Sequence, residues 1–393
     1  MNSGSFPKSS ILGLLIANGL ERIAYYAFRS MFVLFLVYQG TNGEVWEQEK
    51  TFALYAEFTM FVYIGILIGG LLADLITGSF YATLLGGVFT AIGFISIGYV
   101  DSDMIQGISI LIALGTGLMR PNILSLITLQ LQKFPNKLKS IFIAQYLVIN
   151  LSAAIGAMLA GLLITDNIYS NSFILAACCS ALCCLIITLL RKKMSDEAFI
   201  ANRKTNSSEQ GIYKGVLLTF GVAALSLLFW SLWEAADVII SEKDNIDMTL
   251  NGIVNSLTVL ASSIILLIVF WCYKIKSMTI LSMGLLMFSL GWFLIDYSIT
   301  NDWQVSKTII VMMALHSIAE VICSAVFLSI IATKSDKRVL STSFAVFLIA
   351  SYFSGFFANL LVDTEVKLIT FGIVSGLVVF GLMSIPKLQQ KFA

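Results

Sequence analysis

Long apolar stretches recur along the whole chain and constrain its fold more than any other feature. An α-helix needs about 20 predominantly apolar residues to cross the hydrocarbon core of a bilayer. We predict twelve such spans, at residues 10–38, 52–75, 79–100, 105–130, 139–165, 171–190, 215–240, 248–272, 278–299, 307–332, 339–362 and 366–385. Only 12% of the 393 residues are charged, against about 25% in soluble domains. The chain is therefore predicted to be an all-α integral membrane protein.

The basic residues predict how the spans are oriented. Cytoplasmic connections of membrane proteins carry more Lys and Arg than the outer connections. If both termini are cytoplasmic, few of the 24 Lys and Arg residues fall in outer loops, namely Lys50, Lys243, Lys307 and Lys367. We therefore expect both termini in the cytoplasm and a location in the plasma membrane, the inner membrane of a bacterium. No cleavable signal peptide is expected, because the first span is long and charged.

One polar and basic segment, residues 191–214, lies between spans six and seven. It predicts an N-terminal six-helix bundle at 1–190, a cytoplasmic linker at 191–214 and a C-terminal six-helix bundle at 215–393. Twelve helices in two halves around a site near the midplane is the general plan of the major facilitator fold. The net charge of +1 favours no nucleic-acid partner. We expect a monomer in the lipid bilayer that needs neither a metal nor a cofactor, with the cysteines serving as small apolar helix residues.

Three charged residues lie near the middle of the first span, where a charge is costly. They are Glu21, Arg22 and Arg29. A charge at the centre of a spanning helix costs about 2.5–3.5 kcal/mol and persists where it faces a cavity, a partner or a substrate. Arg22 and Arg29 share one helix face with Tyr25 and Tyr26, because their spacing is close to whole helical turns. We interpret this face as one wall of a polar pathway.

Three further charges lie deep in other spans: Arg120 in span four, Glu234 in span seven and Glu320 in span ten. One interpretation is that these charges form ion pairs that only hold helices together. The interpretation we favour is a solute cavity with a basic N-terminal wall and an acidic C-terminal wall. Such a cavity suits a zwitterion, whose carboxylate would face the arginines and whose ammonium group would face the glutamates.

Six short motifs occur in order from span one to span ten. They are NGLERIAYYA at 18–27, GGLLADLITG at 69–78, GTGLMRPN at 115–122, YLVINLS at 146–152, FWSLWE at 229–234 and AEVICS at 319–324. These motifs resemble E-x-x-E-R-F-x-Y-Y-G, G-G-x-x-A-D-x-x-x-G, G-T-G-G-I-K-P-N, I-N-L-G, F-W-x-x-F-E and G-E-L-x-x-S. Those patterns belong to the proton-dependent oligopeptide transporters, a family of the major facilitator superfamily, and the second is shared by the whole superfamily.

The resemblance implies roles for particular residues. The carboxylate side of a peptide site would comprise Arg22, Tyr25, Tyr26, Arg29, Tyr63, Arg120 and Asn150. Glu320, with Asn255, would take the peptide's amino group, and Trp230 and Glu234 would complete the substrate site. The expected proton-coupling residues are Glu21, Glu234 and Glu320. Two opposite-charge pairs, Arg29 with Glu234 and Arg120 with Glu320, are expected to form and break during transport.

The chain departs from the family pattern at several positions. Asn18 replaces the first glutamate of the first-helix motif, and Arg120 replaces a lysine, so the fourth-helix cation has no proton role. The loop after Asp74 lacks the usual basic residues, and the linker is too short for the two extra helices of many bacterial relatives. We expect Asp74 to act as a gate or helix-capping group. We expect His316, the one histidine, to be a hydrogen-bonded helix residue, with a proton relay as the alternative.

The function that best fits these features is proton-coupled symport of di- or tripeptides, or of similar zwitterionic solutes, by alternating access. One alternative is the same fold moving another solute, such as an amino-acid derivative, a nitrate-like anion or a drug. A second alternative is a sensor that binds without transporting. An intramembrane enzyme is disfavoured, because a single histidine excludes H-E-x-x-H and the chain has no G-x-S-x-G.

Overall fold

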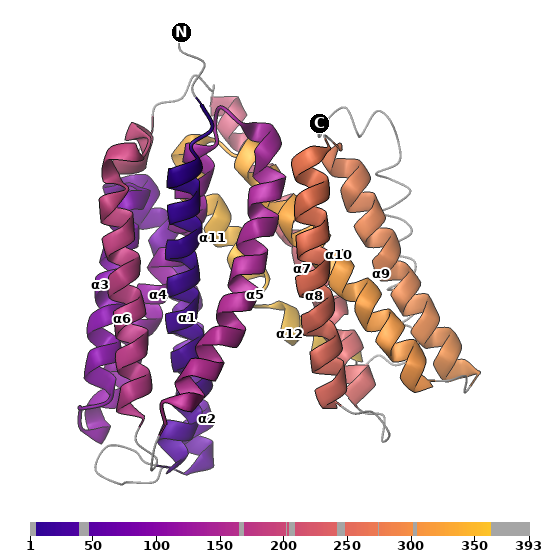
Figure 1. The fold of residues 1–393 in the computed structure, drawn as a ribbon, viewed down its shortest axis with the longest axis horizontal. Coiled ribbons are helices and arrows are strands. Elements are labelled where there is room, and N and C mark those ends of the chain that lie inside the picture. Colours follow the sequence, from indigo (N-terminus) through magenta and orange to yellow (C-terminus); the bar gives the residue numbers. More distant parts are fainter. Residues whose placement is uncertain are drawn as a thin grey trace. The chain divides into compact units, whose positions relative to one another are not determined.

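The computed structural model describes residues 5–38, 47–164, 169–201, 203, 209–241, 248–273, 275–301 and 305–362. These residues contain helices and no β-strand. The helices are α1 (Lys8–Tyr38), α2 (Gln48–Leu72), α3 (Ser79–Ile97), α4 (Ser102–Gln130), α5 (Leu138–Leu162), α6 (Ser170–Leu189), α7 (Glu209–Ser241), α8 (Met248–Cys272), α9 (Ser277–Thr300), α10 (Val305–Lys334), α11 (Leu340–Ala350) and α12 (Ser354–Val362) (Figure 1). The all-α prediction is confirmed.

Most of the predicted spans coincide with these helices. Within the described residues, 10 helical segments are long and apolar enough to cross a membrane. They correspond to predicted spans two to eleven. Helix α1 matches the first predicted span and is 31 residues long, but it is not one of the ten, since Glu21, Arg22 and Arg29 reduce its apolar character. The twelfth predicted span, 366–385, lies outside the described residues.

The eleventh predicted span is interrupted. The sequence predicts one stretch over 339–362, whereas the structure ends α11 at Ala350 and begins α12 at Ser354. The residues between them form a turn. Irregular backbone at membrane depth is tolerated where it is buried in protein or lines a water-filled cavity. The interruption therefore draws attention to the side chains that lie beside it.

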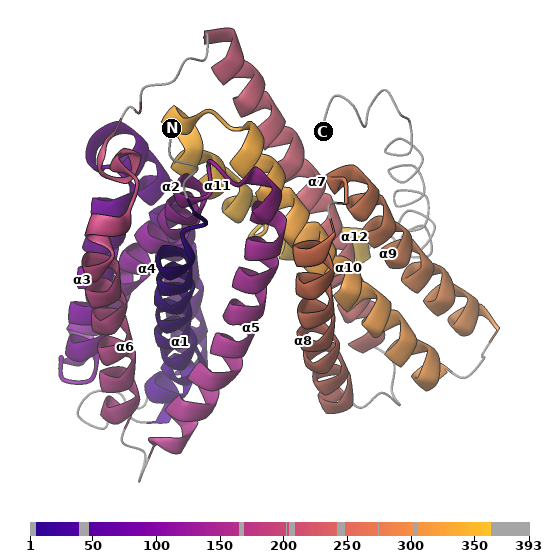
Figure 2. The ribbon, with the colours of Figure 1, turned by 45° about the horizontal axis from the view of Figure 1, so that its top comes forward.

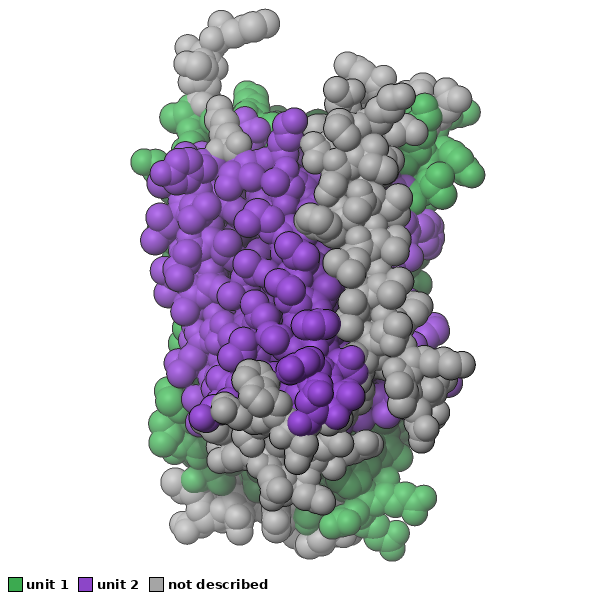
Figure 3. Space-filling model, turned by 90° about the vertical axis from the view of Figure 1, so that its right-hand side faces the viewer, with its two compact units in different colours: residues 1–135, 148–217, 334–349 green, residues 136–147, 218–333, 350–393 purple. Residues whose placement is uncertain are grey.

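Contacts divide the chain into two compact units, coloured separately in Figure 3. Unit 1 comprises residues 1–135, 148–217 and 334–349, and unit 2 comprises residues 136–147, 218–333 and 350–393. The first part of α5 therefore belongs to unit 2, and nearly all of α11 belongs to unit 1. The division into two six-helix halves at linker 191–214 stays a prediction.

Helices α1, α2, α3, α4 and α6 make up the packed body of unit 1 (Figures 1 and 2). Glycines allow α2 and α4 to approach closely: a Cβ atom on Gly117 would lie 2.5 Å from the carbonyl carbon of Gly65. Phe28 forms the centre of an aromatic core between α1 and α6, with ring centroids 4.6 Å from Phe32 and 5.6 Å from Phe173. This core holds α1, the helix that carries the buried charges.

Unit 2 packs α7, α9 and α10 through aromatic side chains. The rings of Phe229 on α7 and Phe288 on α9 lie 4.8 Å apart. Helix α10 approaches α9 at Gly291, where a Cβ atom would come within 2.5 Å of the His316 ring. These contacts fix the orientation of α10, so that the glutamate one turn beyond His316 has a defined position.

Candidate functional site

Glu21 and Arg22 form a buried ion pair in the middle of α1. Arg22 donates hydrogen bonds from Nε and Nη2 to the two carboxylate oxygens of Glu21. The side chains of Arg22 and Glu21 are 6% and 3% exposed, respectively. A bidentate pair of this kind satisfies both charged groups at once. The pairing explains how two adjacent charges persist inside a spanning helix.

The ring of Tyr25 links this ion pair to α4. The guanidinium carbon of Arg22 lies 4.9 Å from the ring centroid of Tyr25, and that of Arg120 lies 4.5 Å from it. Tyr26 packs edge-on against Tyr25, with centroids 5.2 Å apart. Aromatic rings attract guanidinium groups placed within about 6 Å of the ring centroid. The ring of Tyr25 therefore holds two guanidinium groups on adjacent helices.

Arg120 has hydrogen-bonding capacity to spare. Its Nε atom is buried and has no hydrogen-bond partner among the described residues. Leaving a buried donor unpaired costs about 1–3 kcal/mol, and more for a charged group. This atom is therefore suited to receive an acceptor oxygen from a bound solute.

Arg29 lies two turns beyond Arg22 on α1 and contacts a tyrosine that sequence analysis missed. Its Nε donates a hydrogen bond of 2.6 Å to the hydroxyl of Tyr55 on α2. Tyr63, also on α2, interacts electrostatically with both Arg120 and Arg29. The predicted residues Arg22, Tyr25, Tyr26, Arg29, Tyr63 and Arg120 thus form one cluster across α1, α2 and α4. Tyr55 stands outside the quoted motifs, so only its position on the same face of α2 as Tyr63 could have indicated it.

Asparagines in unit 1 have different roles. Nδ2 of Asn122 donates to the carbonyl oxygens of Gly69 and Leu118, at 2.9 and 2.7 Å, and so ties α4 to α2. Asn150, predicted on the carboxylate side, lies on α5 and is half-buried. Asn18, which replaces the first glutamate of the motif, is 5% exposed, and its Nδ2 has no hydrogen-bond partner in the described part of the chain.

Unit 2 contains two of the predicted acidic residues, and Glu320 on α10 is more deeply buried than Glu234 on α7. The hydroxyl of Tyr146, at the start of α5, donates a hydrogen bond to Oε1 of Glu320. Its Oε2 is buried without a hydrogen-bond partner among the residues described. Asn255 on α8 lies in the same unit, and its Oδ1 accepts a 2.6 Å hydrogen bond from Ser317 on α10. The sequence predicts no role for Tyr146 or Ser317.

Glu234 lies beside the interruption between α11 and α12. Its Oε1 accepts a hydrogen bond from the hydroxyl of Ser354, the first residue of α12. A Cβ atom on Gly355 would come within 2.9 Å of its Oε2, so the glutamate carboxylate lies close to the backbone at the start of α12. Trp230, one turn earlier on α7, packs against Trp233 with ring centroids 6.0 Å apart. The broken helix thus presents its N-terminal end to a carboxylate, an electrostatically favourable arrangement.

His316 is held as a packed ring. Its Nε2 lies 3.2 Å from the carbonyl oxygen of Phe288, and its ring lies 4.4 Å from that of Phe288. It is 1% exposed. The prediction of a hydrogen-bonded helix residue is confirmed. In the described residues, no group of three or more His, Cys, Asp or Glu side chains is placed to hold a metal ion.

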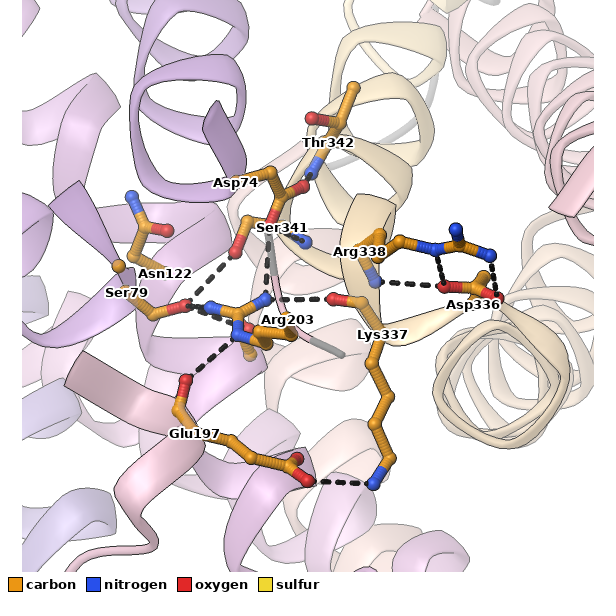
Figure 4. A network of polar contacts seen from close by, with 12 residues as sticks. Asp74, Ser79, Asn122, Glu197, Arg203, Asp336, Lys337, Arg338, Ser341 and Thr342 are labelled. Atoms are coloured by element: carbon orange, nitrogen blue, oxygen red, sulfur yellow. Dashed lines mark hydrogen bonds and ion pairs between the residues drawn. The ribbon is translucent and has the colours of Figure 1, made fainter. Parts of the chain in front are cut away.

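A second polar cluster of unit 1 lies around Asp74, between α2 and α3 (Figure 4). Asp74 accepts hydrogen bonds from the backbone N–H groups of Ser341 and Thr342, at 3.3 and 2.7 Å, in the first turn of α11. The predicted helix-capping role of Asp74 is thereby confirmed. It also forms an ion pair with Arg203, at 3.0 Å. The polar, basic sequence of the linker predicts Arg203 only as a solvated positive charge, because nothing in the linker itself reveals a partner on another segment.

Comparison with known proteins identifies the family. Residues 14–359 match the family model of the Major Facilitator Superfamily. The chain belongs to the major facilitator superfamily. Because this match covers most of the chain, the predicted fold class is confirmed, and the protein is of a transporter family rather than an enzyme family.

Individual relatives extend the comparison. A transporter of Bacillus subtilis named YclF, described as uncharacterized, is 31% identical over 44% of this chain and 36% of its own length. Dipeptide and tripeptide permease A of Proteus mirabilis is 31% identical over 34% of this chain and 27% of its own length. The matches thus cover about a third of these relatives. The crystal structure of the POT family transporter PepTSo has a similar fold, with a TM-score of 0.60, 16% identity and 99% coverage of both chains. The resemblance to oligopeptide transporters is confirmed.

Proposed function

We propose that the protein is a proton-coupled symporter of di- and tripeptides, or of similar zwitterionic solutes. The observation that carries this proposal is a pair of buried charged atoms that have no hydrogen-bond partner among the described residues: Nε of Arg120 in unit 1 and Oε2 of Glu320 in unit 2. The first is a donor suited to a carboxylate, and the second is an acceptor suited to an ammonium group. Each atom is suited to one of the two charged groups of a zwitterionic solute.

The substrate's carboxylate is assigned to the cluster of α1, α2 and α4. Three guanidinium groups, those of Arg22, Arg29 and Arg120, are accompanied there by one carboxylate, Glu21, which is already paired with Arg22. Tyr25, Tyr26 and Tyr63 add phenol rings, and Asn150 adds an amide. An anion bound in this cluster balances an excess of positive charge on the three guanidinium groups.

The substrate's amino group is assigned to Glu320 and Asn255, and Trp230 with Glu234 is assigned to the substrate's side chain. Tyr146 holds Oε1 of Glu320 and leaves Oε2 to the ligand. Ser317 holds Oδ1 of Asn255. We further propose that Arg120 pairs with Glu320, and Arg29 with Glu234, in one conformation and separates from it in the other. Only contacts that differ between two states can shift the equilibrium between them.

Protons are assigned to Glu21, Glu234 and Glu320. The names of the curated relatives support peptides as the substrate, because the Proteus mirabilis protein is named as a dipeptide and tripeptide permease. We further propose that the protein is a monomer in the bacterial inner membrane. The distribution of Lys and Arg along the chain supports cytoplasmic termini.

Uptake of dialanine into proteoliposomes tests the proposal. An imposed proton gradient, acidic outside, is expected to drive accumulation, and an uncoupler is expected to abolish it. Unlabelled tripeptide is expected to compete, whereas free amino acids and nitrate compete weakly. Competition by nitrate but not by peptides would show that the solute is an anion, because such a solute does not need Glu320. Binding of dialanine without uptake would identify a sensor instead.

A further inference from the structure

The linker after α6 is not an extended, solvated segment. It packs against the turn between α2 and α3. It forms two short 3-10 turns, Arg191–Lys193 and Asp196–Phe199. The ring of Phe199 lies 4.7 Å from that of Phe80 at the start of α3. Gly78 has φ of 79°, and a Cβ atom there would lie 2.7 Å from the backbone carbon of Phe199. The turn therefore needs glycine, both for its conformation and for the approach of the linker.

Arg203 is the buried end of this docked segment. It is 1% exposed. Its Nε donates to the carbonyl oxygen of Glu197 at 2.9 Å, and its Nη1 donates to Oδ1 of Asp74 and to the carbonyl oxygen of Lys337, both at 3.0 Å. Its Nη2 donates to the hydroxyl of Ser79. One guanidinium group thus joins the linker, the α2–α3 turn and the residues just before α11 (Figure 4).

Asp74 depends on this cation. It is 2% exposed, and the residues that follow it, Leu75, Ile76 and Thr77, carry no charge. Among the described residues, Arg203 is the one cation that forms an ion pair with it. Removing one partner of a buried pair leaves an uncompensated charge, which is strongly destabilising. The linker therefore supplies the charge that the turn itself lacks.

A second bridge reinforces the same junction. Nζ of Lys337 lies 2.9 Å from Oε1 of Glu197 in the linker and donates, also at 2.9 Å, to the side-chain oxygen of Gln132 after α4. Ser79 and Ser341 share a hydrogen bond of 3.0 Å. The segment that begins α11 is consequently held at several points by unit 1.

This segment has a particular place in the chain. Residues 334–349 belong to unit 1, but both neighbouring stretches, 218–333 and 350–393, belong to unit 2. Residues 334–349 are therefore connected covalently to unit 2 at both ends. In alternating access the two parts of a transporter move against each other, so a contact made by this segment is placed to depend on the state of the cycle.

We propose that Asp196–Phe199 and Arg203 form a linker latch, in which inserted Arg203 locks the start of α11 against the α2–α3 turn and must withdraw when the membrane face that carries the linker opens. The latch goes beyond the assignment of a substrate, and it rests on alternating access rather than on peptides being transported. A linker that reaches into the junction in this way acts on the conformational equilibrium, since it stabilises one state only.

Distance measurements on the whole protein without any solute test the latch. Spin labels are attached to cysteines that replace Ile76 and Lys334, both exposed positions beside the junction, in a background where the six native cysteines are changed to alanine. The parent is expected to show a dominant short distance. Arg203→Gln is expected to raise the ratio of long to short distances about tenfold, because charged hydrogen bonds are lost from only one of the two states.

Three matched variants sharpen the result. Lys192→Gln removes one exposed charge from the same linker and is expected to leave the distances unchanged. Arg203→Lys keeps the charge but cannot reach four acceptors from one nitrogen, so it is expected to shift the distances as Arg203→Gln does. If Arg203→Gln does not fold, Arg203→Met with Asp74→Leu leaves no uncompensated buried charge. The double variant still removes the hydrogen bonds that Arg203 and Asp74 make to residues 337–342, so it is expected to show the same long distances.

Distances for Arg203→Gln, or for the double variant where it is used, that match those of Lys192→Gln would overturn the latch. Because no solute is added, failure of dialanine uptake in the separate transport assay leaves this readout unaffected. A shifted distance in a protein that does not move peptides would sustain the latch and reject the substrate.

Discussion

Two arginines of unit 1, Arg203 and Arg120, differ in how completely their hydrogen-bonding groups are used. Nε of Arg203 and both of its Nη atoms donate to acceptors of the protein. Arg120 lies over the ring of Tyr25, and its buried Nε has no hydrogen-bond partner among the described residues. Arg203 is buried and Arg120 is half-buried, so both guanidinium groups incur a desolvation cost, which is larger for Arg203.

The difference indicates what each group is for. A guanidinium whose N–H groups are all hydrogen-bonded stabilises the arrangement of the segments around it, and its loss leaves the carboxylate of Asp74 unpaired. A guanidinium with an unpaired N–H holds binding capacity that a ligand can use. We therefore expect Arg203 to govern stability and conformation, and Arg120 to govern binding and transport.

The largest expected effect is that of Arg120→Gln on transport. Removing a buried charged partner costs about 2–5 kcal/mol of binding, so kcat/KM for dialanine uptake is expected to fall at least about thirtyfold. The melting temperature is expected to change little, because a buried unpaired donor is removed. Uptake kinetics and thermal unfolding of the purified protein measure the two effects.

Arg203→Gln is the matched comparison, and it is expected to show the opposite pattern. Its melting temperature is expected to fall, because Asp74 loses its one cationic partner among the described residues at a cost of about 3–5 kcal/mol. KM for dialanine is expected to stay close to that of the parent. If both variants lose transport and stability alike, the distinction between the two arginines fails.

Glu21→Gln tests the ion pair of Glu21 with Arg22, a group that is paired within the protein and is also assigned to the substrate site. The carboxylate of Glu21 is satisfied by Arg22 within the same helix. A substrate carboxylate that draws Arg22 away would leave Glu21 as a buried carboxylate without its partner. Glu21→Gln is therefore expected to abolish accumulation driven by a pH gradient.

The same variant is expected to keep counterflow exchange of labelled for unlabelled dialanine, because exchange requires reorientation but no net proton movement. Uphill accumulation by Glu21→Gln would show that Glu21 is not the coupling residue. Its role would then be packing with Arg22.

Much of the helical architecture could be predicted from the sequence, because apolar length and helical period act locally. The clustering of Arg22, Tyr25 and Arg29 also follows from local spacing. The break before Ser354 could not be predicted, because residues 351–353 are Ser-Tyr-Phe and carry no proline or glycine. Its partner, Glu234, lies far away in sequence.

Arg203 was missed for a related reason. A polar, basic stretch is typical of a solvated connection, and its burial depends on an aspartate more than a hundred residues earlier in the chain. The sequence held one signal, the absence of a cation after Asp74. A buried carboxylate without a local cation predicts a cation from elsewhere, but it does not say from which segment.

A smaller effect is expected from changing Tyr25, whose ring contacts the guanidinium groups of both Arg22 and Arg120. Two guanidinium groups lie within 4.9 Å of its centroid, and each cation–π contact contributes about 0.5–2 kcal/mol. Tyr25→Leu is expected to raise KM for dialanine severalfold. Tyr25→Phe keeps the ring and is expected to have a smaller effect, so equal effects of the two would assign the role to the hydroxyl group instead.

The smallest expected effect concerns Glu197, the partly exposed acidic residue of the linker latch. Burial raises the pKa of Glu197, but hydrogen bonds from Gln132 and Lys337 outweigh it and hold the pKa of that carboxyl below its ordinary value. A carboxyl whose pKa is lower in the folded state stabilises the protein above its unfolded pKa, roughly 4.3, and loses that contribution as the pH falls through the folded value. Because Glu197 is partly exposed, the contribution is expected to be below about 1 kcal/mol.

Melting temperatures measured against pH test this expectation. Glu197→Gln is expected to melt slightly below the parent at pH 7 and together with it once the pH is below the folded pKa. Glu209→Gln, which removes an exposed acid at the start of α7, is the control and is expected to show no such convergence. A difference for Glu197→Gln that persists unchanged into acid would mean that its carboxylate charge contributes nothing to the latch. Arg203 alone would then supply the charge that holds the start of α11 against the α2–α3 turn, without a contribution from Glu197.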